Sequence, residues 1–278
     1  MKKEFLAALA ATSLLSLAAC NNQPAADNTA ADNASAAPSG TGLSGTWKVD
    51  LSTVQSDSKP DQLLLTDGKY SCPTCTPPLT LAADGAFHPV TGRPYADSMA
   101  VKVDDSQNVT TTSKKGDKVT GESKYSVSAD GKTLTISFTD STAPNTPVTG
   151  SLTEVRVADA PAGAHAISGS WKLDKYDNVS DEGLTVTYNL DGDTLHMSSP
   201  TGNSYDAMLD GTDAPIKGDS AGTMASVTKT GDNAYEETDK RDGKVLSVTD
   251  FTVDGNTLHI VSHNKRDGST MTYDANRQ

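Results

Sequence analysis

Short runs that alternate apolar and polar residues dominate the chain beyond residue 44. In the run from Thr133 to Thr139, Leu134, Ile136 and Phe138 share one face, and hydroxyl-bearing side chains share the other. Such a period of two residues is typical of a β-strand with one buried face. Because no comparable stretch beyond residue 44 has the helical period, the pattern predicts an all-β protein.

Tight turns separate these runs. Asp-Gly pairs suit the positive φ angles of two-residue hairpin turns. Such pairs start at Asp67, Asp84, Asp130, Asp191, Asp210, Asp242, Asp254 and Asp267. Strands joined by tight turns form an antiparallel meander, and a meander of about eight strands hides its edges by closing into a barrel. A β-sandwich is the alternative that the same pattern allows.

The chain contains two copies of one unit. The motif GTWKVD at Gly45 recurs as GSWKLD at Gly169, and GKTLTI at Gly131 recurs as GNTLHI at Gly255. Between them, PVTG at Pro89 corresponds to PIKG in the second copy. The motifs keep their order and nearly their spacing, which indicates an internal duplication rather than chance.

This duplication predicts two tandem antiparallel barrels. We place the first domain at residues 45–157 and the second at 169–278, with a linker of small residues at 158–168. Residues 20–44 are rich in Ala, Asn, Asp, Ser and Pro, and such a segment buries too little surface to offset its ordering entropy. We therefore expect a flexible N-terminal linker before the first barrel. The inward-facing residues are mid-sized and mostly apolar, so we expect barrel interiors that are mostly filled rather than open.

Residues 1–19 are organised like an export signal: Lys2 and Lys3 precede an Ala/Leu-rich stretch that ends at small residues. The sequence Leu-Ala-Ala-Cys, which ends at Cys20, resembles the bacterial lipobox. The resemblance implies that Cys20 is lipidated and becomes the mature N-terminus, which anchors the protein in the cell envelope. Asn21, in place of the Asp that retains lipoproteins at the inner membrane, points to the outer membrane. An ordinary signal peptide beside a cysteine is the alternative.

The charge balance excludes some partners. The chain has 23 Lys and Arg residues against 36 Asp and Glu, a net charge of −13. A nucleic-acid-binding protein needs a basic face to neutralise phosphates, and adsorption to anionic lipid needs basic residues as well. The sequence therefore predicts no nucleic-acid partner and membrane attachment only through the lipid at Cys20. Aromatic residues make up only 5% of the chain, which argues against one large aromatic core.

Cys72 and Cys75 belong to the only motif that suggests a specific chemistry, Cys-Pro-Thr-Cys. In an oxidising exported compartment two cysteines at this spacing are expected to pair, and Pro73 suits the turn between them. A thiol redox centre is the sharper alternative, but it needs a helix N-terminus, and a strand pattern follows instead. A zinc site would need two further ligands. A structural disulfide is thus predicted.

Other candidate chemistry is weak. Neither His-Glu-x-x-His nor Gly-x-Ser-x-Gly occurs in the sequence. Glu236 and Glu237, beside Asp239, are interpreted as a solvated face rather than a catalytic carboxylate pair. We expect no catalytic residue, no bound metal and no cofactor.

Two family resemblances follow from these motifs. A Gly-x-Trp that opens the first strand of a small up-and-down barrel resembles the lipocalin and avidin group, in which the Trp closes one barrel end. Each copy also resembles a widespread group of uncharacterised bacterial exported proteins, through Gly-Thr-Trp-Lys at Gly45, Pro-Val-x-Gly at Pro89 and Ser-x-Asp-Gly-Lys-Thr-Leu-Thr at Ser128. The second copy departs from the last motif at Val253. The resemblance implies a lipocalin-like fold and an exported location, and no activity.

Together these observations predict a non-enzymatic, lipid-anchored envelope protein with a structural or protein-interaction role. Lipocalin-like binding of a small apolar ligand or lipid is the alternative, and thiol redox chemistry through Cys72 and Cys75 ranks third. The candidate partners are an envelope protein or a small apolar ligand. No ligand-binding residue can be assigned from the sequence.

Overall fold

The structure is a computed structural model that describes residues 42–143 and 145–278. It confirms the predicted all-β fold, because almost all regular structure in these residues is antiparallel strand. The first-half strands are β1 (Gly45–Ser56), β2 (Asp61–Thr66), β3 (Lys69–Cys72), β4 (Leu79–Ala82), β5 (Asp84–Pro89), β6 (Ser98–Val103), β7 (Asn108–Lys115), β8 (Lys118–Val127), β9 (Thr133–Asp140) and β10 (Val148–Ala158). The second-half strands are β11 (Gly169–Val179), β12 (Thr185–Asp191), β13 (Thr194–Ser198), β14 (Ser204–Met208), β15 (Ala214–Pro215), β16 (Met224–Gly231), β17 (Ala234–Arg241), β18 (Lys244–Asp254), β19 (Thr257–Asn264) and β20 (Thr270–Arg277). A short 3-10 helix, η1 (Asp181–Gly183), precedes β12.

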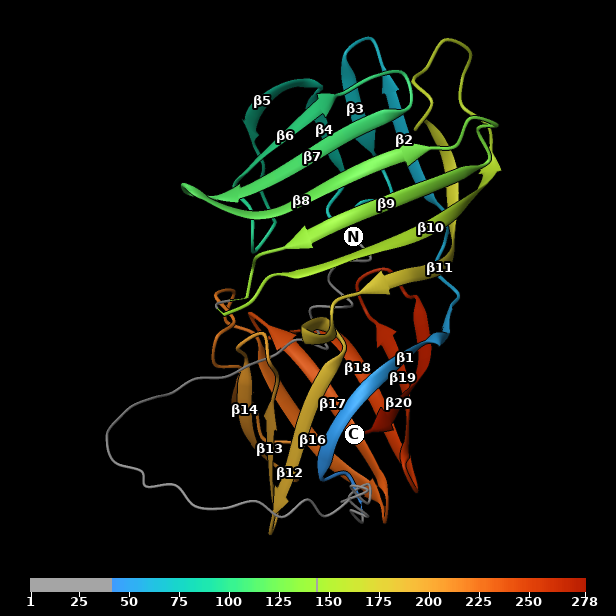
Figure 1. Cartoon of the computed structure of the whole chain (residues 1–278). Coiled ribbons are helices and arrows are strands. Elements are labelled where there is room, and N and C mark those ends of the chain that lie inside the picture. Colours follow the sequence, from blue (N-terminus) through green and yellow to red (C-terminus); the bar gives the residue numbers. More distant parts are fainter. Residues whose placement is uncertain (1–41, 144) are drawn as a thin grey trace, which may run out of the picture.

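The described strands form two 10-stranded sheets, each curled into a nearly closed barrel. One sheet has the order β4-β3-β2-β11-β10-β9-β8-β7-β6-β5, and the other has the order β14-β13-β12-β1-β20-β19-β18-β17-β16-β15. Figure 1 shows the first sheet stacked on the second along the long axis of the molecule. Each sheet has more strands than the eight or so expected from the turn spacing.

The two Trp-bearing strands lie in the opposite sheets from those that chain order would suggest. Strand β1, from the first repeat, pairs with β12 and β20 of the second half. Strand β11, from the second repeat, pairs with β2 and β10 of the first half. The contiguous segment 61–179 therefore completes one barrel, which we call the inserted barrel. It interrupts the chain of the other, which we call the host barrel and which consists of β1 and β12–β20.

This arrangement differs from the predicted division into residues 45–157 and 169–278. Both Trp strands carry the same Gly-x-Trp-Lys-x-Asp pattern, so each presents the same hydrogen-bonding edge and the same inward face. The repeat establishes that two equivalent units exist, but the pattern of a strand cannot specify which of two equivalent sheets it completes. The predicted linker 158–168 also differs from the structure, because Ile167 and Ser168 at its end are fully buried.

The same Trp–Arg arrangement closes one end of each barrel. In the inserted barrel the Arg156 guanidinium lies 4.0 Å from the centre of the Trp171 ring. In the host barrel Arg277 lies 4.1 Å from that of Trp47. Both Trp side chains are fully buried, and each indole N–H donates to the backbone carbonyl four residues earlier.

Gly45 and Gly169 begin the two Trp strands because this closure leaves no room for a side chain. Their φ angles are +143° and +130°, which L-residues rarely adopt. A Cβ at Gly45 would collide with Nη1 of Arg277, and a Cβ at Gly169 would collide with that of Arg156. The glycine of Gly-x-Trp is thus explained by the arginine that covers the ring.

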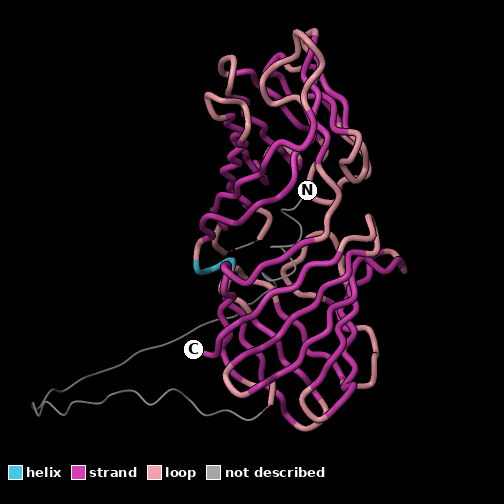
Figure 2. Tube along the Cα trace, turned by 90° about the vertical axis from the view of Figure 1, so that its right-hand side faces the viewer, coloured by secondary structure: helices cyan, strands magenta, loops and turns pink. Residues whose placement is uncertain are grey.

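The two barrels share one hydrophobic core at their junction. Phe138, Val148 and Tyr176 of the inserted barrel belong to the same buried cluster as most of the host interior. The side view in Figure 2 shows the two strand layers meeting at η1 without a long linker between them. A shared core of this kind makes the pair one packed body.

Candidate functional site

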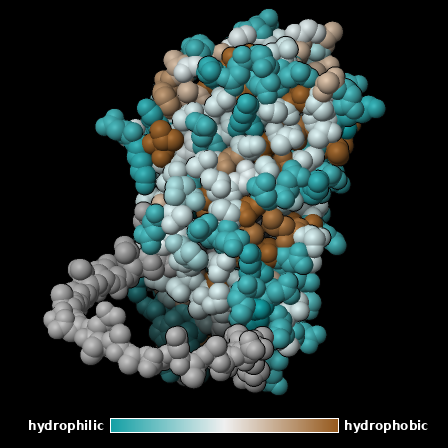
Figure 3. Space-filling model, viewed as in Figure 1, coloured by the Kyte–Doolittle hydropathy of each residue, from teal (hydrophilic) through white to brown (hydrophobic). Residues whose placement is uncertain are grey.

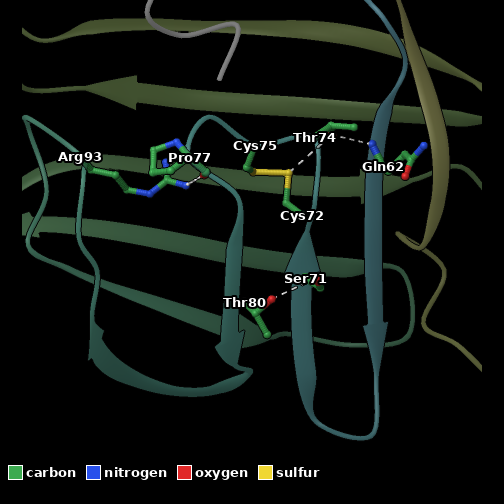
Figure 4. The surroundings of a disulfide bond; sticks show 8 residues. All are labelled: Gln62, Ser71, Cys72, Thr74, Cys75, Pro77, Thr80 and Arg93. Carbon is green, nitrogen blue, oxygen red and sulfur yellow. Dashed lines mark hydrogen bonds between the residues drawn. A yellow bond between two sulfur atoms is a disulfide. The ribbon is translucent and has the colours of Figure 1, made fainter. Parts of the chain in front are cut away.

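The predicted disulfide is present in the structure. Cys72, at the end of β3, is bonded to Cys75 in the following turn, with the Cα atoms 5.3 Å apart. Figure 4 shows the turn beside β2, where the Thr74 hydroxyl accepts a hydrogen bond from the Gln62 backbone N–H at 2.9 Å. Cys72 is buried, and strand β4 rather than a helix follows the turn. This geometry lacks the helix N-terminus on which a redox-active Cys-x-x-Cys relies.

A small cavity lies inside the inserted barrel, next to this disulfide. Its volume is about 50 Å³, and strands β2, β3, β8, β9 and β10 provide most of its wall. The lining residues are Asp61, Leu63, Tyr70, Cys72, Cys75, Tyr125, Ile136, Phe138, Leu152 and Glu154. The inserted barrel therefore contains a small hollow in an interior that buried side chains otherwise occupy.

Two carboxylates stand among the apolar walls of the cavity. Glu154 is fully buried on β10, between the inward residues Leu152 and Arg156. Asp61 begins β2 and is only half-buried. Each acidic residue occupies a position in phase with the apolar face of its strand. That phase is the sequence signal that identifies both residues, which belong to no recognisable motif.

The tyrosine hydroxyls in this barrel respond to these charges. Burial, followed by the charges of Asp61 and Glu154, raises the pKa of Tyr125 to about 12. Burial also raises the pKa of Tyr70, and its hydrogen bond to Tyr125 and the Asp61 charge add to the effect. The pKa of Tyr176 is raised first by burial and then by Glu154 and Asp61. Burial is thus the largest cause for all three tyrosines, and nearby carboxyls add to it, while the positive charge of Arg93 lowers the pKa of Tyr70.

A larger groove, with a volume of about 280 Å³, lies next to the cavity. Its walls come from the crossover between β1 and β2, the disulfide turn and the β19–β20 hairpin. The charged lining residues are Asp57, Lys59, Asp61, Arg266 and Asp267. Asp61 lines both the groove and the cavity. The insertion of one barrel into the other therefore creates the groove, since its walls include both barrels and the crossover.

The host barrel holds a second acidic cluster, which corrects the interpretation of Glu237 as part of a solvated face. Glu237 is 9% exposed and accepts a hydrogen bond from the Tyr205 hydroxyl at 2.5 Å. Asp239 accepts a bond from the Ser247 hydroxyl at 3.0 Å, and its other carboxylate oxygen is buried without a hydrogen-bond partner. Strand β17 turns Glu237 and Asp239 inward, in phase with Tyr235, and leaves Glu236 facing outward.

Burial gives these two carboxyls unusual proton affinity. It raises the pKa of Glu237 to about 8, with the Asp239 charge as the second cause. It raises the pKa of Asp239 to about 6. Beyond them, Arg241 donates to the Tyr95 hydroxyl of the inserted barrel at 3.1 Å, and that hydroxyl donates to Asp219 at 2.6 Å. The acidic cluster of the host barrel is therefore adjacent to a polar contact between the barrels.

The structure does not test the predicted lipid anchor. Cys20, residues 1–19 and most of the linker 20–44 lie outside the described residues, so the lipid anchor stays a prediction. Within the part of the chain that the structure describes, no three or more His, Cys, Asp or Glu side chains are placed to hold a metal ion. The same residues include no helix with the length and apolar character needed to cross a membrane.

Comparisons with known proteins add no further assignment. No family model matches the sequence, no curated protein matches it, and no solved structure matches the fold. The resemblance to lipocalins and to exported Gly-Thr-Trp-Lys proteins therefore stays a prediction.

Proposed function

We propose that this protein is a non-enzymatic, lipid-anchored binding protein of the bacterial cell envelope, and that its inserted barrel holds a small ligand. The observation that carries the proposal is the cavity beside the disulfide. It combines apolar walls with two carboxylates and two tyrosines, and it shares Asp61 with the groove. Small-molecule sites usually have this form, a mostly apolar hollow with a few placed polar groups.

The cellular location in this proposal rests on sequence features. Two lysines, an apolar stretch and a pair of small residues precede Cys20, in the order that a lipoprotein signal requires. The Cys72–Cys75 disulfide agrees with an exported, oxidising compartment, where such bonds persist. A linker of about two dozen polar and small residues would hold the barrels away from the membrane surface.

An interaction role through the outer surface is the second candidate. Its support is the regular, nearly closed architecture, which presents a large outer surface for contacts. On the face shown in Figure 3 the apolar atoms form small separate patches within a hydrophilic or neutral surface. Protein-docking sites more often expose one contiguous apolar patch. The cavity thus favours ligand binding, in contrast to the preference drawn from the sequence.

The test uses the full chain and a matched pair of variants. Ile136 lines the cavity, and Ile260 is its counterpart in the repeat of the host barrel. The protein is incubated with a low-molecular-weight extract of bacterial envelopes, desalted and examined by native mass spectrometry. We expect a one-to-one adduct with the wild type and with Ile260→Phe, but a reduced one with Ile136→Phe, whose larger ring fills the cavity. A wild type without an adduct, or equal adducts in both variants, would contradict the proposal.

The anchor has its own test. Cells are labelled with an acyl-chain analogue, and the wild type is compared with Cys20→Ser. We expect labelling and membrane retention only in the wild type, because the thiol is the attachment atom. Equal labelling of both proteins would remove the lipid anchor from the proposal.

A further inference from the structure

We propose that the host barrel also accepts strand β1 from a second copy of this chain, so that two molecules join by exchanging their Trp strands. This inference concerns self-association and is independent of ligand binding in the inserted barrel. Its basis is the topology, because the host barrel is completed by a strand from the far side of a whole inserted barrel in the chain.

The molecule already contains one exchange of this kind. Strands β1 and β11 hold equivalent places in the two repeats, yet each completes the barrel that the other repeat builds. Were the two repeats separate chains, the same arrangement would be a dimer with reciprocally exchanged strands. Exchange of identical elements joins two chains at little energetic cost, because the exchanged strand makes the same contacts in its new barrel. In this fold a Trp strand and its barrel therefore need not come from one continuous unit.

The host barrel holds β1 through features of the strand itself. Trp47 is fully buried, Arg277 covers its ring at 4.1 Å, and Gly45 leaves room for that guanidinium. On the neighbouring strand, Thr46 is paired with Thr187 of β12, with the two hydroxyls 2.9 Å apart. None of these contacts depends on where the chain continues after β1. The same strand of a second copy can therefore make each of them.

The chain's own β1 competes with that of a copy through proximity. The two strands are identical, and tethering gives the chain's own strand an effective concentration of the order of millimolar. During folding, however, Thr46 must close a loop of 141 residues to reach Thr187, and the entropic cost of closure grows with loop length. Exchange is therefore expected when the concentration of chains approaches this effective concentration.

The connector between β1 and β2 limits how two copies can meet. Strand β1 ends at Ser56 and β2 begins at Asp61, so the connector spans at most about 14 Å when fully extended. Figure 1 shows β1 crossing the front of the host barrel and the connector rising to the inserted barrel. A partner must therefore lie against the junction of the barrels. Short connectors favour exchange, and reciprocal exchange closes a two-fold symmetric dimer rather than an open chain.

The experiment traps exchanged strands with cysteines placed across β1 and β12. All chains are full length and carry Cys20→Ser, and Cys72 is bonded to Cys75, so the introduced thiol is the only free one. A Thr46→Cys chain and a Thr187→Cys chain are mixed, unfolded together in urea, refolded by dilution and oxidised with glutathione. Because these positions face each other, a specific disulfide between the two chains requires β1 of one chain in the host barrel of the other.

The matched control mixes Thr249→Cys with Ser262→Cys. These hydroxyls also lie 2.9 Å apart, but β18 and β19 are consecutive strands of one hairpin and are not exchanged in the proposal. After refolding at roughly millimolar chain concentration we expect about tenfold more disulfide-linked dimer from the β1–β12 pair than from the control, and little from either at roughly micromolar concentration. The mass of the Cys20→Ser chain, measured by light scattering, should rise from monomer to dimer over the same range.

Three outcomes would overturn the proposal. The first is β1–β12 crosslinking no greater than that of the control pair, and the second is a Cys20→Ser chain that stays monomeric over the whole range. The third is a dimer without the crosslink, which would indicate a contact between outer surfaces. Urea unfolding of each variant shows that it is folded, and Lys48→Cys with Thr185→Cys is the neighbouring pair that replaces one that is not. None of these results bears on the proposed ligand binding.

Discussion

Replacing Glu237 by glutamine should change how the stability of the protein depends on pH. Glu237 is 9% exposed in the host barrel and accepts the Tyr205 hydroxyl at 2.5 Å. Burial raises its pKa from 4.5 to about 8, and burial raises that of Asp239 from 3.8 to about 6. Glutamine has nearly the same shape, still accepts the Tyr205 hydrogen bond and carries no charge, so it isolates the effect of ionisation.

The direction follows from proton binding in the two states. Between pH 4.5 and about 8 the folded protein keeps a proton on Glu237 that the unfolded chain has released. The free energy of unfolding therefore falls as pH rises through this window, by up to about 1.4 kcal/mol per pH unit for this group. Asp239 adds a similar fall between pH 3.8 and about 6. Below the unfolded pKa values neither group costs stability, and above pH 8 the full cost is present.

We expect Glu237→Gln to be more stable than the wild type at pH 8.5 by about 2–4 kcal/mol, and to differ little at pH 4. The assay is urea unfolding followed by Trp fluorescence at several pH values. Glu236→Gln is the matched control, because its side chain faces the other side of β17. If the two variants have parallel pH profiles, Glu237 does not hold its proton in the folded state and the reasoning fails.

Three further predictions concern the fold. Replacing Cys72 and Cys75 by serine should lower the free energy of unfolding by at most about 2 kcal/mol, because the bridge closes a very short loop; a larger loss on urea unfolding would show that it also holds the cavity wall. Arg156→Ala should lower the free energy of unfolding by about 2–4 kcal/mol in the same assay, because the guanidinium donates to three backbone carbonyls and covers the Trp171 ring. A near-neutral effect would mean that this Trp–Arg contact does not stabilise the barrel. A fragment of residues 57–180 should give a β-rich circular dichroism spectrum and a cooperative unfolding transition, because it contains every strand of the inserted barrel. A fragment of residues 168–278 lacks β1 of the host barrel and should show neither. The opposite result would support two domains that follow each other along the chain.

The sequence predicts the architecture well because strand, turn and repeat signals are local. Alternation places Leu134 and Phe138 inward, and both are buried in the structure. The Cys72–Cys75 bond is likewise predictable from local signals, which are the cysteine spacing, the intervening Pro73 and the export signal at the start of the chain. The exchange of the Trp strands is not predictable, because two strands with one pattern have two equivalent partners. Only the geometry of the connections decides between them.

The candidate site was harder to predict for a related reason. Asp61, Glu154 and Glu237 belong to no known motif, and an acidic residue in a strand is usually solvated. Their distinguishing feature is their position in the alternation, since each stands where an apolar, inward-facing residue of its strand would be expected. Whether such a residue faces a cavity depends on side chains from other strands, which a single run of sequence does not contain. Position within the alternation is thus the signal to examine first in chains of this kind.

The most direct test of ligand binding in the inserted barrel is an NMR titration of the full chain labelled with ¹³C-tyrosine. The low-molecular-weight envelope extract is added, and signals are assigned by Tyr→Phe substitutions. We predict that the signals of Tyr70 and Tyr125, which line the cavity, shift as the extract is added, while those of Tyr188 and Tyr205 in the host barrel do not. Unchanged signals from Tyr70 and Tyr125, or shifts confined to the host barrel, would contradict the account.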